Sequence, residues 1–207
     1  NASLSVSDSQ FVDSQIDSIA TLNVCPSFFF TNSTILYVMS TKTLFEFQKT
    51  NSAEFSQIII YRLVSQTDIG ILHAINSDYV KVSQALIEGS ISQIQKSAFA
   101  FSDISSIYLD DFNYTQNGIP LMVVSQSNIV FANSYISKND CIEYSKASIP
   151  SSFITLLTGS SFHFINSQFI GNSIPGGFSF LSVDSIVFFM KITFSKNNAP
   201  IQFIQSD

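Results

Sequence analysis

Two adjacent carboxylates, Asp110 and Asp111, are the residues of this chain best suited to chemistry. Neighbouring carboxylates can act as general acid and base, or can hold a divalent cation together with further oxygen ligands. The single arginine, Arg62, lies far from this pair in the sequence, and the additional carboxylates that such a site needs are missing around it. No Cys-x-x-Cys motif, glycine-rich phosphate loop or nucleophile elbow occurs in the sequence. We therefore predict a protein that is not an enzyme and has no catalytic residue, metal site or cofactor.

The two histidines and two cysteines are also expected to have no joint chemistry. His163 alternates with two phenylalanines, which predicts that it points outward from a strand, and His73 is expected at the equivalent place of another repeat. Two such side chains are too far apart to share a metal. Cys25 and Cys141 are expected several repeats apart, beyond the Cα separation of about 7 Å that a disulfide allows.

Composition excludes several classes of partner. Apolar residues make up 45% of the 207 residues and charged residues 12%, against about a quarter in ordinary soluble domains. The net charge is −6 and the nine Lys and Arg form no cluster, so nucleic acid and anionic membrane surfaces are not expected partners. No apolar run is long enough to cross a membrane.

The elements that position these residues are short strands with apolar residues at period two. Hairpin signals are scarce, since Asn117-Gly118 is the one Asn-Gly or Asp-Gly pair. Internal repetition explains the strands instead. Copies of one repeat align at residues 3–14, 106–117, 128–139, 161–172 and 186–197, with a weaker copy at 71–79 and the beginning of another at 45–49.

The aligned copies form columns with a physical meaning. Two apolar columns, two positions apart, lie on one strand face and are expected in the interior: Leu4, Leu72, Ile107, Ile129, Phe162 and Val187, then Val6, Ala74, Leu109, Phe131, Phe164 and Phe189. A column of residues that tolerate left-handed backbone marks a corner: Asp8, Asn76, Asp111, Asn133 and Asn166, with Lys191 as an exception. An aromatic or aliphatic column follows: Phe11, Tyr79, Tyr114, Ile136, Phe169 and Phe194. A second corner completes the pattern: Ser14, Asn117, Asn139, Asn172 and Asn197.

This pattern predicts an all-β fold, a parallel β-helix of about 7–8 coils with about three short strands in each coil. Residues 1–207 are expected to form a single β-helix segment of a longer repetitive chain. The aromatic column and the second corner form a structural ladder, in which like side chains stack from coil to coil. The corner column also gives Asp111 a structural role, which weakens the case for a catalytic pair.

The repeat resembles a known group of proteins. Asn166-Ser-Gln-Phe169-Ile-Gly-Asn172, followed by Gly176-Gly177-Phe178, is similar to the Phe-x-x-Asn and Gly-Gly-x repeats of polymorphic outer-membrane proteins and of large protist surface proteins. Phe-x-x-Asn recurs at residues 194–197, and with Tyr in place of Phe at residues 114–117, whereas the Gly-Gly element occurs once. The resemblance implies a right-handed, pectin-lyase-like β-helix that is exported and acts in adhesion or surface coating.

The function we predict is that of a non-enzymatic structural protein, outside the cell or on its surface. Self-association into a homo-oligomer or fibre, by end-to-end stacking of coils, or stacking on further repeats of the same chain, would cover its open ends. Two alternatives stay open: a polysaccharide-active β-helix enzyme or carbohydrate-binding module, and an adhesin or surface antigen that binds through the insertion containing Glu143, Tyr144 and residues 145–152. Sequons at Asn1, Asn32 and Asn113 are compatible with N-linked glycans.

Overall fold

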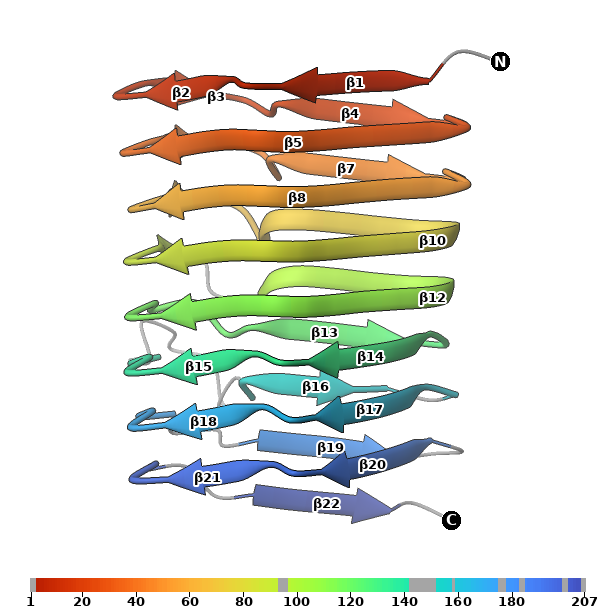
Figure 1. Cartoon of the computed structure of the whole chain (residues 1–207), viewed down its shortest axis with the longest axis vertical. Helices are drawn as coiled ribbons and strands as arrows, with labels where there is room; N and C mark the ends of the chain where they lie inside the picture. Colours follow the sequence, from red (N-terminus) through yellow and green to blue (C-terminus); the bar gives the residue numbers. More distant parts are fainter. Residues whose placement is uncertain are drawn as a thin grey trace.

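The computed structural model of this chain describes residues 3–92, 97–141, 152–157, 159–174, 178–182, 185–198 and 201–205. Within these residues the fold consists of strands and turns without a helix, and every strand pair is parallel. The chain winds from one end of a long axis to the other as a parallel β-helix (Figure 1). In that view the nearer strands run toward the left and the fainter, more distant ones toward the right as the chain descends, which is the sense of a right-handed coil.

Three faces, each a parallel sheet, enclose the interior. The first face is formed by β1 (Leu4–Ser7), β5 (Ser27–Leu36), β8 (Ser52–Tyr61), β10 (Ile69–Glu88), β12 (Ser97–Thr115), β14 (Asn128–Ala132), β17 (Ser161–Ile165) and β20 (Ile186–Met190). The second face combines the C-terminal parts of β5, β8, β10 and β12 with β2 (Gln10–Val12), β15 (Tyr135–Ser137), β18 (Gln168–Ile170) and β21 (Thr193–Ser195). The third face combines the N-terminal parts of β10 and β12 with β4 (Ala20–Asn23), β7 (Phe45–Gln48), β13 (Met122–Ser125), β16 (Ile154–Leu156), β19 (Phe178–Ser182) and β22 (Ile201–Gln205).

A short fourth row lies between the second and third faces: β3 (Gln15–Ile16), β6 (Met39–Ser40), β9 (Val64–Ser65) and β11 (Ile91–Ser92). Within the described residues each of the three faces carries eight strand segments, so seven steps separate the first described coil from the last. The predicted parallel β-helix of 7–8 coils is confirmed.

Each corner turns on one residue with positive φ. The corner between the first and second faces uses Asp8, Asn32, Gln57, Gln84, Asp111, Asn133, Asn166 and Lys191. The corner after the second face uses Asp13, Tyr37, Arg62, Gly89, Gln116, Lys138, Gly171 and Lys196, and the corner after the third uses Val24, Lys49, Asn76, Asp103, Gln126 and Gly159. Lys191, the exception by residue type, therefore adopts the same left-handed backbone (φ 55°) as the rest of its corner. A left-handed residue that is not Gly, Asn or Asp costs about 1 kcal/mol, so other interactions must hold these corners.

Small polar side chains directly after the left-handed residue supply those interactions. Ser127 Oγ accepts a hydrogen bond from the backbone N–H of Ile104 in the preceding coil (3.0 Å), and Ser134 Oγ accepts one from Phe112 N–H (3.3 Å). Each of these hydroxyls also donates to the carbonyl two residues earlier, at 2.7 Å from Ser127 to Ser125. Coils are thus tied to one another at their corners as well as along their strands. The columns derived from the repeat copies did not include these serines, although a serine recurs at this position in several copies.

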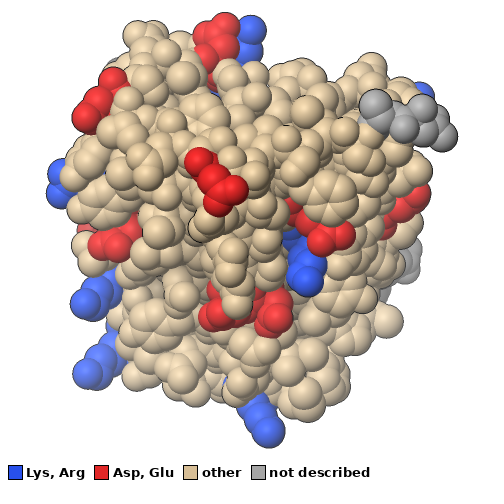
Figure 2. Space-filling view, turned by 45° about the horizontal axis from the view of Figure 1, so that its top comes forward, with Lys and Arg blue, Asp and Glu red and all other residues tan. Residues whose placement is uncertain are grey.

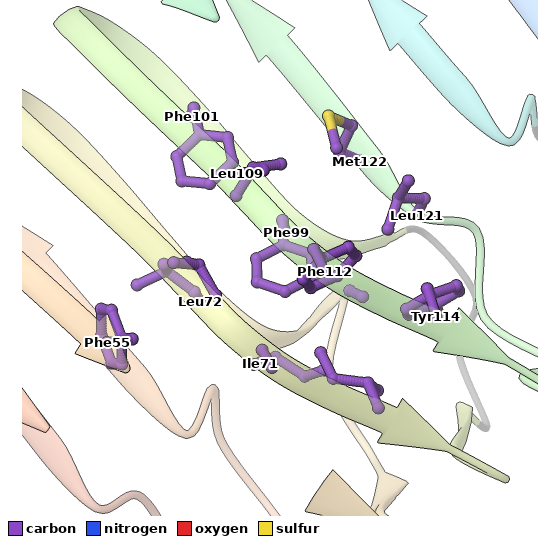
Figure 3. Packing of buried hydrophobic residues seen from close by; sticks show 14 of the residues in the cluster. Phe55, Ile71, Leu72, Phe99, Phe101, Leu109, Phe112, Tyr114, Leu121 and Met122 are labelled. Carbon is purple, nitrogen blue, oxygen red and sulfur yellow. The ribbon is translucent and has the colours of Figure 1, made fainter. Parts of the chain in front are cut away.

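The interior is packed with aromatic and aliphatic side chains, nearly all buried between the first and last coils. Figure 3 shows Phe99, Phe112 and Tyr114 side by side in this core. The rings of Phe99 and Phe112 meet edge to face at 5.7 Å, and those of Phe112 and Tyr114 stack at 6.1 Å. Such pairs add about 0.5–1.5 kcal/mol each beyond the burial of their area.

The weaker repeat copy was assigned to the wrong face. Leu72 pairs with Phe45 and Phe99, so residues 72–75 and 45–48 belong to the third face rather than the first. Leu72, Ala74, Asn76 and Tyr79 therefore stand one corner away from their predicted columns, and Tyr79 begins the following first-face segment. The true first-face partners of Ile107 and Leu109 in that coil are Val80 and Val82. The error arises because each of the three corners turns at one residue with positive φ, and each of the three faces has the same alternation of inward and outward residues. The local sequence pattern is therefore the same on every face.

Candidate functional surfaces

A row of buried asparagines runs along the second corner. Asn139 donates from Nδ2 to Asn172 Oδ1 (2.8 Å) and to the carbonyl of Tyr114 (3.0 Å), and its Oδ1 accepts from the backbone N–H of Asn117 (2.9 Å). Asn172 repeats this geometry with Asn197 (Nδ2 to Oδ1, 2.8 Å). Asn117, Asn139 and Asn172 are all at most 1% exposed. The side chains replace the backbone partners that a tight corner removes, so the row supports the fold.

The aromatic column lies beside that row. Its members on the second face are Phe11, Ile35, Ile60, Ile87, Tyr114, Ile136, Phe169 and Phe194. The Phe169 and Phe194 rings stack at 4.9 Å. Tyr114 donates its buried hydroxyl to the Ile119 carbonyl (2.7 Å), and burial raises its pKa well above the usual value. In the Phe-x-x-Asn motif the Phe ring therefore points inward and the next residue points outward. The third residue has the left-handed backbone of the corner, and the Asn amide points inward.

The two adjacent carboxylates occupy separate structural positions. Asp110 lies on the first face, where its Oδ1 accepts from Asn133 Nδ2 (2.8 Å). Asp111 is the left-handed corner residue that follows, with a φ of 50°. Among the described residues no group of three or more His, Cys, Asp and Glu side chains is arranged to hold a metal ion.

The histidines lie on different faces, which corrects the prediction that they are equivalent. His163 is on the first face with its ring 5.7 Å from that of Phe188. His73 is on the third face, in register with Glu46 and Ala100. The misassigned repeat copy is again the cause.

The cysteines have unlike environments. Cys25 follows the first coil, is partly exposed and donates to the Ser27 carbonyl (3.3 Å). Cys141 follows β15 and is buried, and burial, with a smaller contribution from Asp140, raises its pKa to about 12. Both are free thiols.

An aromatic and cationic cluster, Tyr37, Tyr61 and Arg62, projects at the second corner. The two tyrosine rings meet edge to face at 5.5 Å, and the Arg62 guanidinium carbon lies 5.6 Å from the Tyr37 ring centre and 5.2 Å from that of Tyr61. Gly89, in the next coil, makes room for this arginine, because a Cβ there would come within 3.2 Å of Arg62 Cγ. Tyr37 is 47% exposed, so the cluster is open to a partner. Tyr61 and Arg62 are adjacent in the sequence, whereas Tyr37 belongs to the preceding coil and becomes their neighbour only through coil stacking.

A hollow, which we term the corner groove, runs along the first corner. It is lined by Asn32, Gln57, Ile59, Gln84 and Asp111, and it is shallow and open, with a volume of about 440 Å³. Four of these residues are the left-handed corner residues of successive coils, and Ile59 is an exposed residue of the second face. The groove therefore combines hydrogen-bonding groups with one apolar wall.

The outer surface of β20 is apolar as well. Ile186, Phe188 and Met190 are 67%, 48% and 41% exposed, while Val187 and Phe189 face the core. The five consecutive apolar residues of this strand, in place of an alternating pattern, were the sequence signal for it.

Charges are sparse elsewhere. Figure 2 shows acidic and basic side chains scattered over a surface that is mostly uncharged. Lys42 and Asp17 form an exposed ion pair at 3.5 Å. The part of the chain that the structure describes contains no helix able to span a membrane.

The sequons differ in position. Asn32 is an exposed corner residue, whereas Asn113 is a half-buried residue of the second face, in register between Leu86 and Tyr135. Asn1, Glu143, Tyr144 and residues 145–151 lie outside the described residues, as do Gly176 and Gly177.

Comparison with known proteins adds no relative. No family model matches this chain, and no curated protein matches it. The β-helix repeat therefore stands on the structure, and the likeness to polymorphic outer-membrane proteins and protist surface proteins stays a prediction from its motifs.

Proposed function

We propose that this chain is a non-enzymatic structural protein of the cell exterior whose first and last coils stack end to end on further coils, either those of a second copy or further repeats of the same chain. The observation that carries the proposal is the state of its two terminal coils. The inward apolar side chains, which are buried in the middle coils, are only partly buried in these two coils. The edges of their parallel strands can also pair with another coil.

The first coil presents one such layer. Leu4 is 42% exposed, although its column partner in the next coil, Phe28, is fully buried. Val6, Phe11, Ile16, Ile19 and Leu22 are likewise only partly buried against the core. These residues line all sides of the coil, so they form a complete apolar end layer.

The last coil presents the complementary layer, with Val187, Phe189, Ile192 and Phe194 partly buried. The columns match across a head-to-tail contact. A second copy placed in register would set its Leu4, Val6 and Phe11 on Val187, Phe189 and Phe194, about 4.8 Å away. Such a contact does not close on itself, so repetition yields a fibre.

The extracellular location is supported by composition. Uncharged polar side chains dominate the outer surface, so side chains of like charge do not stack on one another from coil to coil. Two sequons also lie on described strands or corners. The motif resemblance to exported surface proteins points the same way.

Complementary end variants test the assembly. Phe11→Lys leaves the C-terminal layer intact, and Phe194→Lys leaves the N-terminal layer intact. We expect the native chain to form concentration-dependent filaments in sedimentation velocity and electron microscopy, and each variant alone to stay monomeric. An equimolar mixture of the two variants should give dimers that do not extend, because only one pair of intact ends remains.

The control is Ile186→Lys, which adds the same charge to an outward position of the last coil. Filaments should persist in this variant, and circular dichroism should show that all three variants fold. Monomers at every concentration for the native chain, or filaments in both end variants, would refute end-to-end assembly.

A carbohydrate-binding module is the second candidate, favoured by the Tyr37–Tyr61–Arg62 cluster. Exposed tyrosines offer flat surfaces to sugar rings, and a guanidinium can bind a uronate carboxylate in bidentate fashion. Titration calorimetry with an acidic polysaccharide tests this. Tyr37→Ala should abolish the binding and Tyr108→Ala, at an exposed tyrosine of the first face, should not. Incubation with and without Ca²⁺ tests for cleavage.

A further inference from the structure

The corner groove begins at a sequon. Asn32 opens the sequence Asn32-Ser33-Thr34 and lines one end of the groove, which then passes Gln57, Gln84 and Asp111 in three further coils. At about 4.8 Å per coil this is a path of about 14 Å, enough for two or three sugar units. We propose that the corner groove seats the first sugars of a glycan attached to Asn32. This inference rests on the extracellular location proposed above.

Corner side chains are bonded from coil to coil on both sides of the groove. On the N-terminal side Asn32 Nδ2 donates to Asp8 Oδ1. On the C-terminal side Asn133 Nδ2 donates to Asp110 Oδ1 and Asn166 Nδ2 donates to Asn133 Oδ1, both at 2.8 Å. Side-chain hydrogen bonds between coils therefore flank the groove on both sides.

The side chains that line the groove between these bonds are in a different state. Within the described part of the chain the side chains of Gln57, Gln84 and Asp111 have no hydrogen-bond partner. They are exposed, and they line the hollow together with Ile59, which is 42% exposed. Two amides and a carboxylate are thus free to bind a polar ligand that lies along the corner.

Sugar chemistry suits this lining. An N-linked glycan begins with two N-acetylglucosamine units, which carry hydroxyls and acetamido groups that both donate and accept. The Gln57 and Gln84 amides can donate and accept in return, and the Asp111 carboxylate can accept from a hydroxyl. Ile59 offers an apolar surface to the C–H face of a ring. One coil step is also close to the length of one sugar unit in an extended chain.

The backbone around Asn32 presents its amide outward. Asn32 has a φ of 45°, and Ser33 is buried with its Oγ accepting from Ser9 N–H (3.2 Å) and donating to the Thr31 carbonyl (2.7 Å). A glycosylated asparagine amide retains one N–H, which is sufficient for the bond to Asp8. A sugar and the bond to Asp8 can therefore share this amide nitrogen.

Asn113 provides an internal comparison. It lies within a strand segment of the second face, half-buried between Leu86 and Tyr135, and the corner groove does not include it. A glycan on Asn113 therefore has no such seat. The two sequons should differ in how accessible their glycans are in the folded protein.

Enzymatic release of glycans from the folded chain tests the proposal. The full chain is secreted from a eukaryotic host, site occupancy is measured by mass spectrometry, and peptide-N-glycosidase F is added without denaturant. Release from Asn32 should be about tenfold slower than from Asn113, because the seated sugars must first leave their hydrogen bonds. After denaturation the two rates should be equal.

Glycine substitutions remove groove groups without straining the corner, because glycine adopts positive φ freely. Gln57→Gly and Gln84→Gly should each raise the rate at Asn32 severalfold and leave Asn113 unchanged. Gln126→Gly, at an exposed left-handed position of another corner, should change neither rate. Equal release from both sites in the folded native chain, an unmodified Asn32, or groove variants without effect would overturn the inference. Sedimentation of the same samples reports end-to-end assembly separately, so the two proposals can fail independently.

Discussion

Replacement of the buried Asn139 by alanine should be among the most damaging single changes in this molecule. The side chain is fully buried and makes three hydrogen bonds, two donated and one accepted. The variant leaves the backbone N–H of Asn117 and the carbonyl of Tyr114 without this partner in a region that water does not reach. Each buried group that loses its partner costs about 1–3 kcal/mol, so we expect a loss of about 3–5 kcal/mol in the free energy of unfolding.

Asn197→Ala is the matched control. Asn197 belongs to the same row and also makes three hydrogen bonds, with Asn172 N–H, Asn172 Nδ2 and the Phe169 carbonyl. It lies in the last coil and is only partly buried, so water can replace the missing amide. The expected loss is about 1 kcal/mol.

Urea denaturation followed by circular dichroism measures both variants, with the shift in midpoint compared at constant m-value. Asn139→Asp sharpens the test, because its ionised carboxylate would face the Tyr114 carbonyl and Asn172 Oδ1. Burial should raise the pKa of this new carboxyl, so the variant should be less destabilised, relative to the native chain, at pH 4 than at pH 7. A cost below 1 kcal/mol for Asn139→Ala, or equal costs for Asn139→Ala and Asn197→Ala, would refute the reasoning.

Three further predictions concern the corners, the thiols and the core. Lys138→Gly should stabilise the fold by about 0.5–1 kcal/mol in the same urea assay, because Lys138 has a φ of 53°, and a loss of stability would contradict the corner argument. A maleimide at pH 8 should label Cys25 rapidly and Cys141 only on unfolding, as peptide mapping can check. Because the pKa of Cys141 is raised to about 12 in the folded chain, the unfolded chain loses the thiol proton at a lower pH than the folded chain does. The free energy of unfolding should therefore fall by about 1.4 kcal/mol per pH unit from about pH 9 toward pH 12, with no such effect below pH 8. Cys141→Ala should remove this part of the pH dependence. Phe131→Ala, at a ring in contact with Phe162 and Phe164, should cost about 3–5 kcal/mol through the cavity that it leaves.

Local rules account for the part of the fold that could be predicted. Alternation at period two separates inward from outward residues, and it placed Ile107, Ile129 and Phe162 correctly in one interior column. The Phe-x-x-Asn spacing identified the second corner, because an inward ring and an inward amide three positions apart fit one left-handed residue between them.

The same local rules could not assign a segment to a face. Leu72 and Val80 both belong to alternating strands that end at a left-handed residue, yet they lie on the third and first faces. A coil contains three such strands, so residue type alone leaves three registers open. Backbone hydrogen bonding between whole coils decides among them.

The candidate surfaces were still less accessible to sequence reasoning. The Asn32 sequon was visible, but the groove beside it depends on Gln57, Gln84 and Asp111, which are ordinary polar residues in the sequence. Tyr37 and Arg62 likewise carry no motif.

Residue types and their spacing by themselves determined that this chain forms a stacked β-coil with an apolar, phenylalanine-rich interior and polar corners, because those features follow from alternation and turn chemistry within a few residues. Tertiary structure alone decided the face to which each segment belongs, the opening of the corner groove and the pairing of Arg62 with Tyr37. These depend on the axial stacking of residues more than 20 positions apart, and loops of unequal length at the corners conceal that register in the linear sequence.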